Sequence, residues 1–101
     1  MIVVRNIFRT KFGRSKEVTA LWKQAMSISQ RLGFGQQGTR LLTDLAGPPF
    51  YTLIFETTHE SLAQWEKASQ AFRSDPQWQA VYQQISALTD EGRREILSMI
   101  E

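Results

Sequence analysis

The chain has 101 residues, the size of a single domain, because domains usually contain about 100–150 residues. Apolar residues make up 42% of it and charged residues 22%, a composition that excludes disordered and collagen-like chains. The formal net charge of only +2 argues against a nucleic-acid partner, and the absence of cysteine excludes disulfides and cysteine-ligated metals. We therefore expect one packed domain over residues 1–101.

The N-terminal region gives no sign of export or membrane insertion. Residues 1–5 lack the basic region and the apolar run of a signal peptide. No stretch of the sequence approaches the about 20 apolar residues that a membrane-spanning helix needs. The sequence therefore predicts a cytoplasmic protein with no membrane partner.

The chain begins with a predicted strand and a predicted helix. Residues 2–9 are rich in Ile, Val and Phe, which favours a strand that ends before Gly13. Ser15 offers an N-cap for the helix, and Gly33 is expected to end it. The apolar residues between them are spaced three or four apart, as on one stripe of a helix: Val18, Leu21, Trp22, Ala25, Ile28 and Leu32.

Two strands and the start of a second helix are predicted in the middle of the chain. The strands, at residues 39–46 and 50–57, flank a Gly-Pro-Pro linker that neither a helix nor a β-ladder tolerates, so they should form a hairpin. The Thr-Thr-His-Glu sequence at 57–60 matches a capping box, in which a Thr and a Glu satisfy the first free amides of a helix. We therefore expect His59 in the first turn of that helix.

The C-terminal part predicts a split helix and a last strand. Asp75 and Pro76 should restart the helix, because Asp caps free amides and proline fits the first helical position. The expected apolar stripes are Leu62, Trp65, Ser69 and Phe72 before this point, and Trp78, Val81, Tyr82, Ile85 and Leu88 after it. A turn at residues 89–92 and a strand at residues 94–101 should complete the chain.

The resulting order is β-α-β-β-α-β, which defines an α+β, ferredoxin-like fold with a four-stranded antiparallel sheet and helices on one face. The strands carry apolar residues on both faces: in the first one, Val4 and Phe8 alternate with Val3 and Ile7. The face without helices should therefore also need burial, and a second copy across a twofold axis would cover it. We predict a homodimer through the sheet face, with the barrel-like core of a dimeric α/β barrel.

A glycine-rich segment and a lone histidine suggest no nucleotide or metal site. Residues 33–38 fit G-x-G-x-x-G, but they follow a helix, whereas a dinucleotide-binding turn opens one, so we interpret them as a flexible turn. His59 is the only histidine, which rules out a two-histidine metal site in one chain. At a helix start it would be either an exposed residue or a neutral imidazole that accepts a proton or ligates haem.

Aromatic and polar residues suggest a ligand cleft. The three tryptophans, Trp22, Trp65 and Trp78, lie on helix stripes that face the sheet, where they either fill the core or stack on a flat ligand. Polar strand residues must be paired or line a pocket, and Arg40 with Asp44 could form a same-face ion pair. The candidate ligand-binding residues are Asn6, Trp22, Arg40, Tyr51, His59 and Trp65. No catalytic residue, metal or cofactor is predicted.

The Asp-Pro-Gln-Trp-Gln sequence at 75–79, preceded by the aromatic strand at 50–56 and by Ser-Leu-Ala-Gln-Trp-Glu at 61–66, resembles the NIPSNAP-like group of the dimeric α/β-barrel superfamily. The resemblance covers nearly the whole chain in element order. It implies a ferredoxin-like protomer that dimerises through its sheet, with Asp75, Pro76 and Trp78 in structural roles.

The resemblance leaves the activity open. The superfamily also contains cofactor-independent monooxygenases of polycyclic phenols and haem-degrading oxygenases that use an Asn, a Trp and a helix histidine. Asn6 and Trp65 are possible counterparts of the first two, but His59 does not sit where that iron ligand belongs.

Two functions remain open from the sequence. In the first, the protein binds a small planar or apolar ligand between helices and sheet, and could act as a monooxygenase-like enzyme in which Arg40 or Asn6 stabilises a phenolate. In the second, it is a non-catalytic dimeric scaffold or regulatory module, since the sequence contains no recognisable paired base, nucleophile or metal cluster. The sequence does not decide whether the protein is an enzyme.

Overall fold

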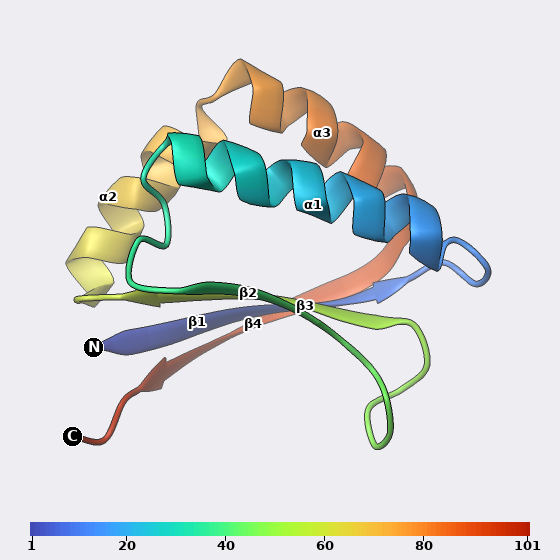
Figure 1. The fold of residues 1–101 in the computed structure, drawn as a ribbon, viewed down its shortest axis with the longest axis horizontal. Coiled ribbons are helices and arrows are strands. Elements are labelled where there is room, and N and C mark those ends of the chain that lie inside the picture. Colours follow the sequence, from blue (N-terminus) through green and yellow to red (C-terminus); the bar gives the residue numbers. More distant parts are fainter.

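Seven helices and strands follow one another in the computed structural model, which describes residues 1–101. They are β1 (Ile2–Thr10), α1 (Ser15–Arg31), β2 (Thr39–Thr43), β3 (Thr52–His59), α2 (Leu62–Arg73), α3 (Pro76–Ala87) and β4 (Thr89–Ser98). The strands form one antiparallel sheet in the order β2-β3-β1-β4. All three helices lie on the same side of this sheet, and both chain termini lie at one end of it (Figure 1). The predicted ferredoxin-like fold is confirmed.

Side-chain caps begin α2 and α3 but not α1, and two of the predicted caps are wrong. Ser15, predicted as the N-cap of the first helix, is the first residue of α1, and the residue at the cap position, Arg14, makes no side-chain cap hydrogen bond. Asp75 accepts a hydrogen bond from the backbone N–H of Trp78 at 2.9 Å, and Pro76 is the first residue of α3, as predicted. The capping box at 57–60 is wrong, because β3 continues to His59, which pairs with Ile2 of β1. Ser61 caps α2 instead, with its hydroxyl accepting from the N–H of Gln64 at 3.1 Å.

The hairpin between β2 and β3 is confirmed, but β2 ends three residues earlier than predicted and β3 both begins and ends two residues later. The Asp44 carboxylate accepts the backbone N–H of Thr52 at 3.0 Å, which closes the hairpin loop early. Tyr51 has a positive φ of 65°, in the left-handed region that a strand residue does not adopt. Residues 44–46 and 50–51 therefore belong to the loop.

The turn predicted at residues 89–92 is also wrong, because β4 begins at Thr89 and ends at Ser98. Gly92 pairs with Phe8 of β1, and a β-carbon at position 92 would come within 2.8 Å of the Phe8 ring. An aromatic ring that covers a glycine across a ladder is a known stabilising device in sheets. Pairing with β1 therefore prevails over the turn propensity of this segment.

The core between the helices and the sheet is built around aromatic rings. The Trp22 ring lies 5.1 Å from the rings of Phe8 and Phe55, and the Phe72 ring lies 4.5 Å from that of Trp78, measured between centroids. Trp22 and Trp78 are both buried, as the core interpretation of these residues predicts. None of the helices combines the length and apolar character required to cross a membrane.

The opposite face of the sheet carries alternate strand residues and no helix. Val3 and Ile7 of β1 lie on it, while their neighbours Val4 and Phe8 pack toward the helices. The register places Ile54 of β3 beside Ile7. The prediction that the strands carry apolar residues on both faces is confirmed.

Candidate ligand-binding cleft

A cleft of about 1040 Å³ lies between α2 and α3 on one side and β1 and β4 on the other. Its volume lies just above the range of about 300–1,000 Å³ that is typical of small-molecule sites. The residues that line it divide into an aromatic wall and a polar rim. This is the position between helices and sheet at which the sequence analysis places a ligand.

The aromatic wall is continuous with the core. It is formed by the side chains of Phe8, Trp22, Phe34, Phe55, Trp65, Phe72, Trp78 and Tyr82. Tyr82 is 52% exposed, and its ring centroid lies 5.5 Å from that of the buried Trp78, so the wall passes from the core to the surface. Such a surface can stack on a flat ring and remove it from water.

On the polar side, one arginine links two of the predicted site residues. The Nε of Arg94 donates a hydrogen bond to Oδ1 of Asn6 at 2.7 Å, and its Cζ lies 5.1 Å from the centroid of the Trp65 ring. Asn6 and Arg94 are directly paired across the β1–β4 ladder, while Trp65 reaches them from α2. The structure thus brings Asn6 and Trp65 together through Arg94.

The Trp22 indole N–H is the one buried side-chain polar atom that has no hydrogen-bond partner. Burying such a donor without a partner costs about 1–3 kcal/mol. Trp22 lines the cleft, but its nitrogen is covered in the structure. A ligand in the cleft would therefore reach this N–H only if the groups that cover it moved.

His59 lies elsewhere, and the expectations that it begins a helix and that it is exposed are wrong. It is the last residue of β3, not a helix residue, and it is 1% exposed. Its Nδ1 lies 3.1 Å from Oε1 of Gln64 and its Nε2 lies 2.8 Å from the Thr57 hydroxyl. Because an amide oxygen only accepts, Nδ1 carries the proton and Nε2 accepts from Thr57. Both ring nitrogens are occupied, so iron ligation would require breaking one of these bonds.

We expect His59 to titrate with a pKa below its ordinary value of 6.5, because burial disfavours the charged ring more strongly than Gln64 favours it. The unfolded chain therefore binds this proton more readily, and the free energy of unfolding should fall as the pH drops below 6.5. NMR spectra of the imidazole nitrogens measure the pKa directly, because the chain has a single histidine.

A His59→Gln variant is the control for this titration. It should lose the part of the pH dependence of stability that begins near pH 6.5. An imidazole that titrates at or above 6.5 in the folded protein would contradict the burial argument.

Arg40 lies outside the cleft, on the sheet face that carries no helix. It does not pair with Asp44; its Nε donates to Oε2 of Glu56 at 2.7 Å, while Oε1 of Glu56 accepts from Nε of Arg5, also at 2.7 Å. Burial raises the pKa of the Glu56 carboxyl, but the hydrogen bonds and charges of the two arginines outweigh it and hold the pKa below its ordinary value. Glu56 is therefore a carboxylate clamped between two cations.

Tyr51 lies in the hairpin loop, also away from the cleft. Its ring centroid is 5.2 Å from that of the exposed Phe12, and both rings line a smaller hollow of about 500 Å³ together with Phe50. Of the six predicted site residues, the structure thus places Asn6, Trp22 and Trp65 in the cleft. Arg40, Tyr51 and His59 lie in three other places.

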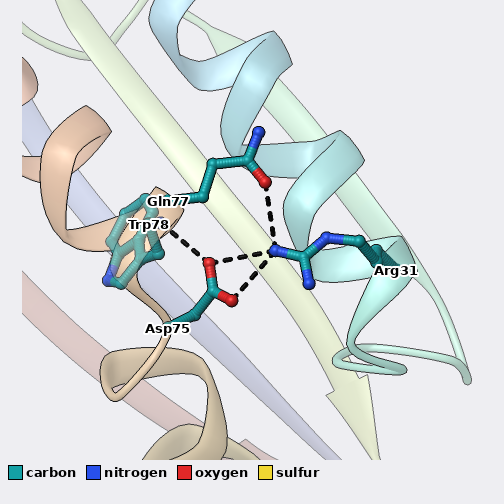
Figure 2. Close-up of polar contacts among 4 residues, drawn as sticks. All are labelled: Arg31, Asp75, Gln77 and Trp78. Atoms are coloured by element: carbon teal, nitrogen blue, oxygen red, sulfur yellow. Dashed lines mark hydrogen bonds and ion pairs between the residues drawn. The ribbon is translucent and has the colours of Figure 1, made fainter.

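The Asp-Pro-Gln-Trp-Gln motif holds α1 and α3 together (Figure 2). Nη2 of Arg31, the last residue of α1, donates to both carboxylate oxygens of Asp75 at 2.9 and 3.0 Å and to Oε1 of Gln77 at 3.1 Å. The same carboxylate caps α3 through the N–H of Trp78. This backbone hydrogen bond, followed by the bond from Arg31, lowers the pKa of Asp75. The contacts support the structural role that the resemblance implies.

Asp75 should make the stability of the fold sensitive to acid. A carboxyl whose pKa is lowered on folding contributes stability above its ordinary value of 3.8, and this contribution is lost as the pH falls through the folded pKa. We expect Asp75→Ala to lower Tm at pH 7 by roughly 5 °C, since it removes a helix cap. Asp75→Asn keeps an oxygen acceptor without the charge, so its deficit relative to the natural chain should shrink in acid. Thermal melts between pH 3 and pH 7 measure both variants, and a pH-independent deficit of Asp75→Asn would refute the role of the charge.

Arg94, which organises the polar side of the cleft, is not among the site residues predicted from the sequence. The sequence predicts it only as the first residue of the last strand, and that strand begins five residues earlier, at Thr89. The feature that marks Arg94 as a site residue is its pairing with the polar Asn6 on the helix-facing side of two neighbouring strands. This feature can be recognised only once the register of the two strands is known.

Comparison with known proteins places the fold. No family model matches the chain, and no curated protein matches it in sequence. A NIPSNAP family protein from Agrobacterium tumefaciens has a similar structure, with a TM-score of 0.86, 22% identity, and coverage of 99% of this chain and 93% of that one. An uncharacterized NIPSNAP domain protein from Burkholderia xenovorans gives a TM-score of 0.83 at 18% identity, covering 99% and 95% of the two chains.

The likeness extends to a second group of structures. A putative antibiotic biosynthesis monooxygenase from Nitrosomonas europaea covers 100% of both chains, with a TM-score of 0.75 at 10% identity. At these identities the likeness is one of fold. The chain therefore has the ferredoxin-like fold of NIPSNAP family proteins, and the structural resemblance expected from its sequence is confirmed.

Proposed function

We propose that the protein binds a small, flat, aromatic ligand in the cleft between α2, α3 and the β1–β4 half of the sheet. The observation that supports this most is the aromatic wall, which continues from the buried Trp78 to the half-exposed Tyr82. Ligand sites are typically apolar and aromatic, with a few polar groups that fix orientation. Asn6 and Arg94 supply such groups at the same cleft.

Thermal shift with three probe classes tests the binding: an anthrone-type phenol, a hydroquinone and haem. A ligand present at about 100 times its Kd stabilises a protein by about 2.7 kcal/mol, which is readily measured in a domain of this size. Trp65→Ala should reduce the shift, because it removes an aromatic ring from the cleft. Leu62→Ala is the matched control, since Leu62 is on the same helix, is 48% exposed and does not line the cleft. If none of the probes shifts the melting curve, the proposal fails.

We also propose that a phenolic ligand in this cleft is oxidised by molecular oxygen. The support is the likeness in fold to proteins named as antibiotic biosynthesis monooxygenases. For an anthrone-type substrate, a CH₂ group and O₂ would give a C=O group and water, so one oxygen atom enters the product and the other leaves. An oxygen electrode measures uptake against heat-unfolded protein. Binding without uptake would favour the alternative, a non-catalytic binding module.

The third element of the proposal is a homodimer that buries the helix-free face of the sheet. A row of apolar side chains crosses three strands of this face, where Leu42 pairs with Ile54 and Ile54 pairs with Ile7. The face also carries charges of both signs, including Glu56 between its two arginines, so a second copy could meet it with complementary charges. Sedimentation at micromolar concentration tests this, and a stable monomer would overturn it.

A further inference from the structure

Two contacts fix the guanidinium of Arg94 at the cleft. Its Nε is bound to Oδ1 of Asn6 at 2.7 Å, and the group lies over the ring of Trp65 at 5.1 Å from the centroid. The first contact sets the direction of the side chain, and the second sets the ring against which the guanidinium rests. The head group is therefore held in place although the residue as a whole is exposed.

The terminal nitrogens of Arg94 have no partner within the protein. Other arginines, such as Arg31, Arg40 and Arg93, form ion pairs with carboxylates, whereas Arg94 forms none. A guanidinium has N–H donors on all three nitrogens, and only the Nε donor of Arg94 is used. A positioned pair of donors thus remains available to an acceptor in the cleft.

The uncompensated charge around the cleft is mainly positive. Arg73, at the end of α2, also lines it without an ion pair. Of the two lining carboxylates, Asp90 is bound to Lys11 at 2.9 Å, and Glu91 faces Arg9 across the ladder. Glu91 forms no ion pair, so the charged groups at the cleft without a partner are the guanidiniums of Arg73 and Arg94 and the carboxylate of Glu91. An anion near Arg94 therefore meets a net positive charge.

We infer that the ligand of the proposed cleft carries a carboxylate, and that Arg94 binds it. This inference rests on the proposed binding function and names the class of ligand: a flat aromatic carboxylate whose ring packs on the aromatic wall. The planar fork of an arginine matches a carboxylate with two parallel hydrogen bonds. Asn6 and Trp65 act as positioning residues, because they hold the guanidinium and leave its terminal donors free.

A matched pair of probes separates the charge from the ring. Naphthalene-2-carboxylate and naphthalene-2-carboxamide have the same ring and nearly the same shape, and only the first is ionised at pH 7. Isothermal titration calorimetry measures the affinity of each for the natural chain and for Arg94→Met. Arg93→Met is the matched control, because Arg93 is on the same strand and also borders the cleft, but its guanidinium is already bound to Glu95 at 2.7 Å.

The natural chain should bind the carboxylate about tenfold or more tightly than the amide, as expected for a charge-assisted hydrogen-bond pair. Arg94→Met should abolish this preference without changing the affinity for the amide, and Arg93→Met should preserve it. Arg94→Lys keeps the charge but loses the planar fork, so it should retain an intermediate preference for the carboxylate over the amide. It provides a second test if the methionine variant fails to fold.

Two other outcomes would separate a failure of the carboxylate inference from a failure of the proposed binding function. Equal affinity for the two probes, or an equal loss of both in Arg94→Met, would show that Arg94 only supports the cleft wall, and would overturn the carboxylate inference alone. Failure of the natural chain to bind either probe would overturn this inference. If the three thermal-shift probes also failed, the proposed binding function would fall as well.

Discussion

Replacing Trp22 by alanine is expected to lower the free energy of unfolding by about 3–5 kcal/mol. Trp22 is 3% exposed and lies where α1 meets the sheet, with the Phe8 and Phe55 rings at 5.1 Å and the Trp78 ring at 6.0 Å. The loss is a large part of the about 5–15 kcal/mol that a domain possesses in total. Urea denaturation followed by circular dichroism measures it.

Trp22→Phe is the control for this experiment. It keeps an aromatic ring in the stack and removes the indole N–H that has no partner. The free energy lost with the larger ring is therefore partly offset, because the unpaired N–H no longer has to be buried. We expect it to be clearly more stable than Trp22→Ala. A loss of less than 1 kcal/mol in the alanine variant would mean that the core is not centred on Trp22.

The second large effect is expected at Glu56. Its carboxylate is 6% exposed and bound by Arg5 and Arg40, so Glu56→Ala leaves two guanidinium groups close together with no anion between them. We expect a loss of about 1–2 kcal/mol, a figure that is reduced because both arginines are partly exposed to solvent. The effect should be largest above pH 4.5, the ordinary pKa of Glu, and should disappear as the pH falls through the lowered pKa of the folded state.

A second carboxylate on the same face provides the comparison. Glu95 is bound to Arg93, whose side chain is largely exposed, so Glu95→Ala should cost no more than about 1 kcal/mol. Denaturation at several pH values, combined with sedimentation, separates the effect on folding from the effect on the proposed dimer. If Glu56→Ala and Glu95→Ala lowered the free energy of unfolding equally and independently of pH, the ion pairs of Glu56 with Arg5 and Arg40 would stabilise the fold no more than an exposed ion pair does.

Local signals in the sequence were sufficient to locate α1 and the start of α3. The spacing of apolar residues predicted α1, and the Asp75-Pro76 pair predicted the start of α3, because caps and stripes are set by neighbours within one or two turns. The capping box at 57–60 failed for the opposite reason. Thr and His also suit a strand, and the choice was made by β1, which pairs with this segment from more than 50 residues away.

The site was predictable only in part, for a similar reason. Alternation along a strand divides its residues between two faces, but it does not say which face receives the helices. Asn6 and Trp65 both contact Arg94 at the cleft, whereas Arg40 lies on the other face. Arg94 is 88 residues from Asn6 in the chain, so their contact depends on the pairing of the first strand with the last.

The glycine at position 92 limits how the cleft can change. Any β-carbon there would press on the Phe8 ring at 2.8 Å, and that ring is stacked on Trp22 at 5.1 Å. Even a methyl group at position 92 would therefore force the Phe8 ring or the strand to shift. Because Phe8 and Gly92 both line the cleft, such a shift would change the shape of the cleft wall.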